Sequence, residues 1–159
     1  MKPSVTTDAV AFTIPMPPST NKLFRNNFGK GRGRIKTKAY HSFTAEAICA
    51  IRQQNVQPIK GNIIMVWAFE RDSKLADVSN RIKAAEDAIV DAGIIDDDRF
   101  ATAHFLCWAP KANSICHVQI FSSQHMALEF YPSDDGSTGA IIVNKPTTQG
   151  ENNDDDFTV

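Results

Sequence analysis

Few of the features that mark membrane or secreted proteins occur in this sequence. Only three of its 159 residues are cysteines, and no two of them form a Cys-x-x-Cys pair. Apolar runs such as residues 63–68 are far shorter than the about 20 residues that a membrane-spanning helix needs. The first ten residues lack the charged start and apolar stretch of a secretory signal. We therefore expect a cytoplasmic protein with no membrane segment.

Motifs for nucleotide or zinc binding are missing as well. The glycine-containing run 29–33 lacks the terminal Lys-Ser/Thr order of a P-loop and does not directly follow a buried strand. The four histidines do not pair with the cysteines at zinc-ligand spacing. These absences argue against a P-loop enzyme and against a zinc-binding module.

The net charge of −1 conceals an uneven distribution. Residues 1–60 contain ten Lys or Arg and two acids, residues 61–131 contain six and ten, and residues 132–159 contain one and six. The first part of the chain is therefore strongly basic and the last part acidic. A total near zero does not exclude a nucleic-acid partner here.

Four extended stretches organise the predicted sheet. Residues 10–14 predict a strand that ends at the following prolines, and residues 62–69 are apolar enough for a strand in the centre of a sheet. Two further β-like runs, 100–108 and 114–121, predict a hairpin because only five residues separate them. The segment 19–38 has no clear period, so we expect it to be irregular and exposed.

Two amphipathic helices are predicted. The first begins near Ala39 and has four core-facing residues at close to 3.6-residue spacing: Tyr40, Phe43, Ala47 and Ile51. The second spans about Val78 to Ala92, with candidate caps at Asp77 and Ser79, and ends at Gly93. From residue 132 onward polar residues dominate. We expect one α+β domain, residues 1–131, with a mixed sheet flanked by two helices, and a disordered acidic tail, residues 132–159.

The polar face of the second helix holds the residues that are suited to metal binding or catalysis. It carries Asn80, Lys83, Asp87 and Asp91, which alone would be typical of an exposed helix surface. Further acids stand at both ends of this helix, and they meet only if the sheet returns the acidic turn 96–98 toward it. A carboxylate cluster beside a basic segment is the arrangement that holds Mg²⁺ against a phosphodiester.

These residues resemble a known family. The stretch from Asp77 to Asp98, with Asn80, Lys83 and Gly93 at their spacings, is similar to the signature of RusA-type Holliday-junction resolvases, small endodeoxyribonucleases of bacteria and their phages. Residues 14–22, IPMPPSTNK, resemble the family's opening P-x-P-P-S-x-N segment. The two motifs lie some 60 residues apart in the right order, and together the matches cover about residues 10–125.

The resemblance implies a RusA-like homodimer that uses Mg²⁺ to nick two strands of like polarity at a four-way DNA junction. It also implies that Asp77 and Asp98 bind the metal, that Asp97 assists beside Asp98, and that Asn80 adjoins the first acid. Lys83 matches the catalytic lysine, which would stabilise charge on the phosphate or help to position water.

One position departs from the family pattern. Where the usual motif reads D-x-D-N, this chain has Ser79 in place of the second acid. Ser79 would reach the metal through water, be compensated by Asp96 or Asp97, or mark a loss of activity. A second hypothesis is therefore a non-catalytic protein of the same fold that binds branched DNA.

The basic segment is predicted to bind phosphates, although a merely solvated loop would have the same composition. Seven basic residues lie within positions 22–38, and no acid occurs between Asp8 and Glu46. The predicted DNA-binding residues are Asn21, Lys22, Arg25, Lys30, Arg32, Arg34, Lys36, Lys38 and Asn80.

The acidic end of the chain allows three interpretations. Its run of acids followed by Phe157 resembles the tips by which single-strand-binding proteins recruit repair partners. It would otherwise keep the protein soluble, or fold back on the basic segment as a DNA mimic.

Overall fold

The computed structural model describes residues 8–27, 33–70, 77–109, 114–124, 127–134 and 139–144. The chain divides into two compact units, residues 1–123 and 124–159, and each is described here by itself. Within the described ranges, no helix is both long and apolar enough to cross a bilayer.

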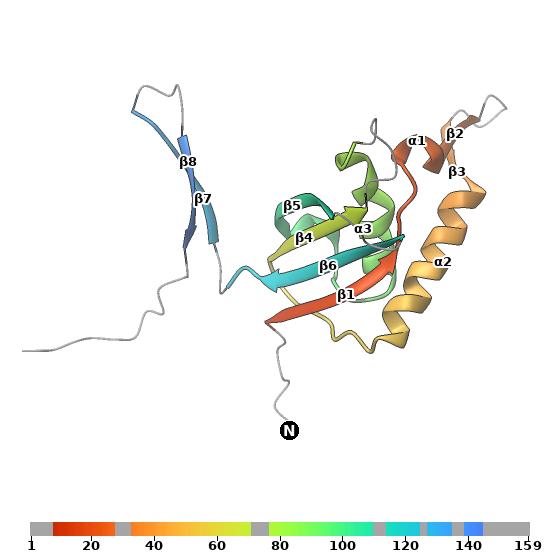
Figure 1. Ribbon diagram of the computed structural model, residues 1–159, viewed down its shortest axis with the longest axis horizontal. Coiled ribbons are helices and arrows are strands. Elements are labelled where there is room, and N and C mark those ends of the chain that lie inside the picture. Colours follow the sequence, from red (N-terminus) through yellow and green to blue (C-terminus); the bar gives the residue numbers. More distant parts are fainter. Residues whose placement is uncertain are drawn as a thin grey trace, which may run out of the picture. The chain divides into compact units, whose positions relative to one another are not determined.

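The first unit is built on a four-stranded mixed sheet with the order β1-β6-β4-β5 (Figure 1). Its strands are β1 (Ala9–Pro15), β4 (Ile63–Glu70), β5 (Ala101–Ala109) and β6 (Ile115–Ser122). β4 runs parallel to β5, whereas β6 is antiparallel to both β4 and β1. The α+β class, the mixed sheet and the central place of β4 agree with the sequence-based predictions.

The predicted hairpin between residues 100–108 and 114–121 is wrong. These two runs form β5 and β6, but β4 lies between them and pairs with both. The short connection misled the prediction because five residues can span up to about 16 Å, more than the about 10 Å between strands two places apart. Strand β4 takes the middle position because its side chains are buried or partly buried on both faces.

Helices cover one face of the sheet. They are α1 (Thr20–Leu23), α2 (Lys38–Gln53), α3 (Ile82–Asp91) and the short 3₁₀ helices η1 (Ser79–Arg81) and η2 (Asp98–Phe100). The buried residues of α2 are the four predicted ones, Tyr40, Phe43, Ala47 and Ile51. The second predicted helix starts later than expected, because its first turn is the 3₁₀ helix η1. It ends as predicted, since Gly93 follows with a positive φ of 77°.

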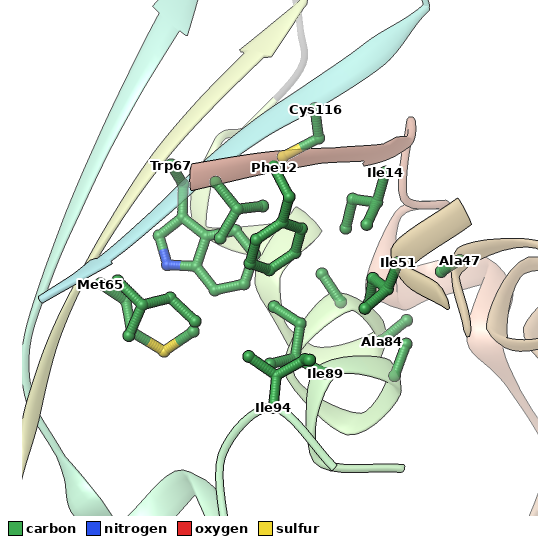
Figure 2. Packing of buried hydrophobic residues seen from close by; sticks show 14 of the residues in the cluster. Phe12, Ile14, Ala47, Ile51, Met65, Trp67, Ala84, Ile89, Ile94 and Cys116 are labelled. Atoms are coloured by element: carbon green, nitrogen blue, oxygen red, sulfur yellow. The ribbon is translucent and has the colours of Figure 1, made fainter. Parts of the chain in front are cut away.

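The core lies between these helices and the sheet. Figure 2 shows Phe12, Met65 and Trp67 from the strands facing Ile51 of α2 and Ile89 of α3. Trp67 and Ile89 are fully buried, and the Trp67 ring stacks on Phe69 at 6.0 Å between centroids. This packing holds the apolar side of α3 against the sheet and leaves its polar side exposed.

The segment 19–38, predicted to be irregular, contains regular structure instead. After α1, strands β2 (Phe24–Asn27) and β3 (Gly33–Lys36) form an antiparallel hairpin in which Phe24 is opposite Lys36. All four residues of β3 are exposed, so the apolar alternation that reveals a half-buried strand is absent. Lys30 and Arg32 lie outside the described residues.

An amide side chain covers part of the free edge of β1. Gln54, the residue after α2, accepts a hydrogen bond from the Thr13 backbone N–H through Oε1 at 2.9 Å. Its Nε2 donates to the Thr13 carbonyl at 2.8 Å. Because β1 is an outer strand of the sheet, the Gln54 amide occupies the place of a neighbouring strand's peptide group.

The second unit contains a further strand pair. Strands β7 (Ala127–Pro132) and β8 (Gly139–Asn144) pair antiparallel, with Phe130 opposite Ile141. Within the predicted disordered tail, residues 132–159, the apolar residues 141–143 belong to this paired strand. The predicted domain boundary at 131 falls inside β7, whereas the second compact unit begins at residue 124. The acidic end, residues 145–159, lies outside the described residues.

The position of α3 depends on Ile89, so we expect Ile89→Ala to lower the free energy of unfolding by about 2–5 kcal/mol. Urea unfolding followed by tryptophan fluorescence measures the change. The matched control is Ile82→Ala, on the same helix but only partly buried, which should cost less. An equal loss in the two variants would contradict the packing described.

Candidate functional site

Lys83 lies between two carboxylates on the polar side of α3. Its Nζ is 3.0 Å from Oδ1 of Asp87, one helical turn further along, and 3.0 Å from Oδ2 of Asp98. Asp98 begins η2, directly before β5. The turn between helix and strand is anchored by the buried Ile94, whose carbonyl accepts a hydrogen bond from the Ile59 backbone N–H. The acidic turn thus reaches the polar side of the helix at Lys83 and Asp98, but Asp77 is not among the residues that line the cleft there.

The two carboxylates keep Lys83 charged. Hydrogen bonding to Asp87, and also to Asp98, raises the pKa of Lys83 far above its usual 10.5. The Lys83 hydrogen bond in turn lowers the pKa of Asp98. Lys83 is thus a cation at neutral pH and cannot act as a general base, but a fixed ammonium can stabilise negative charge that develops on a phosphate.

A buried tyrosine continues this network toward the basic hairpin. The Tyr40 hydroxyl of α2 donates to Oδ2 of Asp87 at 2.6 Å, and accepts from Nζ of Lys36 at 2.6 Å. The Lys36 ammonium also lies 4.0 Å from the Tyr40 ring centroid. Four side chains, from β3, α2 and α3, therefore connect the end of the hairpin with Lys83.

These groups line an open cleft of about 320 Å³. Two lysines and four carboxylates face it, together with one hydroxyl and one apolar residue. The lining residues are Lys36, Tyr40, Lys83, Asp87, Val90, Asp91, Asp97 and Asp98. Asp97 also caps η2, since its Oδ1 accepts from the Arg99 backbone N–H at 2.9 Å.

Asp77 and Ser79 form a separate cluster that does not line this cleft. The Asp77 carboxylate accepts hydrogen bonds from the Ser79 backbone N–H at 3.0 Å, from Ser79 Oγ at 2.8 Å and from Asn80 Nδ2 at 3.3 Å. Asp77 thereby holds the first turn before α3. Ser79 supplies a donor to Asp77 at the position where the family pattern has an acid.

The two motifs on which the resemblance rests do come together in space. The Thr20 hydroxyl donates to the Asn80 carbonyl at 2.9 Å. The buried Arg81 donates from Nη1 to the Pro17 carbonyl at 2.8 Å. The proline-rich segment therefore packs against the start of the helical motif.

The cleft matches Mg²⁺ in the kind of donors it offers. Mg²⁺ takes oxygen ligands and keeps several waters, so that one or two carboxylates suffice. Within the described ranges, however, no three His, Cys, Asp or Glu side chains converge as a metal-binding group. The predicted metal residues are accordingly divided, with Asp97 and Asp98 at the cleft and Asp77 and Ser79 in their own cluster.

The predicted DNA-binding residues that the structure describes surround the hairpin and the ends of α1 and α2. Asn21, Lys22, Arg25, Arg34, Lys36 and Lys38 are exposed, and Asn80 is partly buried. The Arg34 guanidinium lies over the Phe24 ring at 5.5 Å. The exposed cations remain accessible to a phosphate backbone.

Beneath the cleft, α3 carries a buried acid that the sequence did not reveal. Glu86 is 7% exposed, and its Oε1 lies 3.3 Å from Nε2 of His104 on β5. Nδ1 of His104 accepts from the Trp67 indole N–H at 3.2 Å, which places the imidazole proton on Nε2, facing Glu86. Burial raises the pKa of Glu86 to about 7 and lowers that of His104.

Tyr40 and Asp87 were also missed as site residues. Asp87 belonged to the predicted polar face and stands four residues from Lys83, a spacing at which helix side chains meet. The sequence pattern predicted Tyr40 only as a core residue, because no local pattern indicates a contact with a residue 47 positions away.

Comparison with known proteins identifies no relative, because no protein-family model and no curated protein match this sequence.

Glu86 makes the stability depend on pH. Between its usual pKa of 4.5 and about 7, the folded protein keeps a proton that the unfolded chain releases, so stability falls as the pH rises through this window. In Glu86→Gln this loss disappears. The free energy of unfolding of the variant, relative to the unchanged protein, should rise by about 2 kcal/mol from pH 5 to pH 8.

Urea unfolding at the two pH values measures this difference. Glu46→Gln, at an exposed position of α2, is the control and should show no such trend. A pH-independent effect of Glu86→Gln would contradict the buried, protonated state of Glu86.

Proposed function

We propose that this protein is a Mg²⁺-dependent, structure-specific endodeoxyribonuclease that resolves four-way DNA junctions by paired nicks as a homodimer. The observation that carries the proposal is the Lys83 ammonium, held 3.0 Å from both Asp87 and Asp98 in an open acidic cleft. The proposal also draws on the resemblance to RusA-type resolvases and on the basic hairpin beside the cleft.

The charge of the cleft supports a cation-dependent reaction. Two lysines against four carboxylates leave its lining net negative, so a phosphodiester would be repelled. A divalent cation would offset that repulsion. Asp97 and Asp98 would hold Mg²⁺ at the cleft, and the ion would supply an activated water and charge neutralisation. Asp77, which lies in its own cluster, would hold metal at the start of the helical motif.

The protein's own groups would hold the DNA and stabilise the reacting phosphate. Exposed cations on and beside the β2–β3 hairpin, including Arg25, Arg34 and Lys38, would contact phosphates, and the affinity would fall steeply with salt. Lys83 remains protonated, so its role is to stabilise the charge that develops on the reacting phosphate.

The second candidate function is binding of branched DNA without cleavage. It is favoured by Ser79, which donates its hydroxyl to Asp77 in place of a second carboxylate, and by the lack of a three-ligand group among the described residues. Tight junction binding without Mg²⁺-dependent nicking would identify this function.

Nicking of a synthetic four-way junction tests the two candidates. With Mg²⁺, we expect symmetric nicks from the unchanged protein and a decrease in rate of about 100-fold or more in Lys83→Met and Asp98→Asn. Junction affinity in Ca²⁺, measured by fluorescence anisotropy, should change much less than the rate.

A matched ion pair outside the cleft provides the control. Lys60 pairs with Asp96 at an exposed position near the same turn, so Lys60→Met removes a paired ammonium at another place. This control should nick at the unchanged rate. If it loses as much activity as the cleft variants, the cleft is not the active site.

Ser79 gives a test that does not depend on cleavage. Ser79→Asp places a carboxylate next to the Asp77 carboxylate and removes the hydroxyl donor, so the melting temperature should fall in EDTA. Millimolar Mg²⁺ should recover much of that loss if the metal binds at Asp77. Ser79→Ala removes the same donor without adding charge, and an equal response of both variants to Mg²⁺ would exclude metal binding there.

A further inference from the structure

The side chain of Tyr40 is placed to control Lys83. Tyr40 is 2% exposed, and its ring packs against Phe24 of β2, with 6.0 Å between the centroids. Its backbone N–H is bonded to the Thr37 hydroxyl, which caps α2. A ring fixed in this way also fixes its hydroxyl oxygen, which lies 2.6 Å from Oδ2 of Asp87.

This contact determines how Asp87 meets Lys83. The carboxylate offers Oδ2 to Tyr40 and Oδ1 to Lys83, so it cannot turn both oxygens toward the ammonium. Lys83 is then shared equally with Asp98, at 3.0 Å from each acid. Without the tyrosine hydroxyl, Asp87 would be free to rotate and Lys83 would lose its fixed position.

Lys36 connects the same tyrosine to the basic hairpin. Its ammonium donates to the Tyr40 hydroxyl, but Lys36 is exposed at the end of β3 and remains accessible to a phosphate. The hairpin is tied to the start of α2, because Thr37 bonds the carbonyls of Leu23 and Lys22 through its N–H and hydroxyl. A phosphate bound at the end of the hairpin would therefore engage the same Lys36 ammonium that donates to the Tyr40 hydroxyl.

We infer that Tyr40 is a positioning residue for Lys83, and that Lys36 links it to phosphate binding at the β2–β3 hairpin. Within the proposed nuclease, this series of contacts would set the position of the Lys83 ammonium when the hairpin binds DNA. The inference rests on the proposed function for its catalytic meaning, but the contacts can be tested without any cleavage.

The rate at which the hydrogens of the Lys83 ammonium exchange with water, measured by NMR, shows how firmly the two carboxylates hold this group. The signal is assigned by its loss in Lys83→Met. In Tyr40→Phe, which keeps the buried ring, the ammonium should exchange at least about fivefold faster, because one of its two carboxylates is no longer fixed. Unchanged exchange in a folded Tyr40→Phe would overturn the positioning role.

Lys36→Met tests the link to the hairpin without disturbing the core. A four-way junction, added without divalent metal, should change Lys83 exchange in the unchanged protein and in Lys60→Met, an exposed lysine away from the hairpin, but not in Lys36→Met. An equal response in all three proteins would show that DNA reaches Lys83 without Lys36 and would overturn the link.

Nicking kinetics separate this inference from the proposed function. If the protein is a nuclease, Tyr40→Phe should lower kcat by about tenfold with KM changed less than twofold, as expected for a misplaced catalytic group. A binding protein without nuclease activity would still show the exchange effects. If Ile82→Ala, which weakens the packing of the helix that carries Lys83, lowers kcat by as much as Tyr40→Phe, the role of Tyr40 is merely structural and the inference is overturned.

Discussion

The site depends on the burial of one side of α3 against β4. Ala84, Ala85, Ala88 and Ile89 are fully buried there, so the opposite side of the helix must face outward with Lys83 and Asp87. The parallel pairing of β5 with β4 sets the position of Asp98. This residue lies three residues before β5, so the register of the pairing determines where it stands. An apolar contact and a backbone strand pairing thus bring two ends of a charged network together. Electrostatics refines the positions of these side chains but does not create their proximity.

Charge in this protein is separated over short distances. A mostly acidic cleft adjoins a hairpin whose described side chains include Arg25, Arg34 and Lys36. The Lys36–Tyr40 contact joins the two regions. Tyr40 is well suited to this place because its hydroxyl accepts from a cation and donates to an anion at the same time. A phenylalanine would fill the same core volume, so core packing alone does not explain a tyrosine here.

Local patterns predicted the elements better than their arrangement. The 3.6-residue spacing in α2 identified all four of its buried residues, and the all-apolar run of β4 indicated its central place. The order of the strands could not be predicted, because the alternation of residues along a strand shows which side chains share a face and not which strands pair. β5 and β6 were predicted to be neighbours only because their connection is short. Within the site, the spacing of Lys83 and Asp87 was visible on one helix. The contact of Tyr40 with Asp87 joins two helices and is a property of their packing, which no single segment encodes.

The amide of Gln54 on β1 has a consequence for how two copies could assemble. An outer strand accepts another chain through the free N–H and C=O groups along its edge, and at Thr13, in the middle of β1, both are already engaged by Gln54. The opposite outer strand is β5, which carries the exposed Phe105, 44% accessible. A dimer made by continuing this sheet from one subunit into the next would join more readily at β5, and the two clefts would then be related through the strand that follows Asp98.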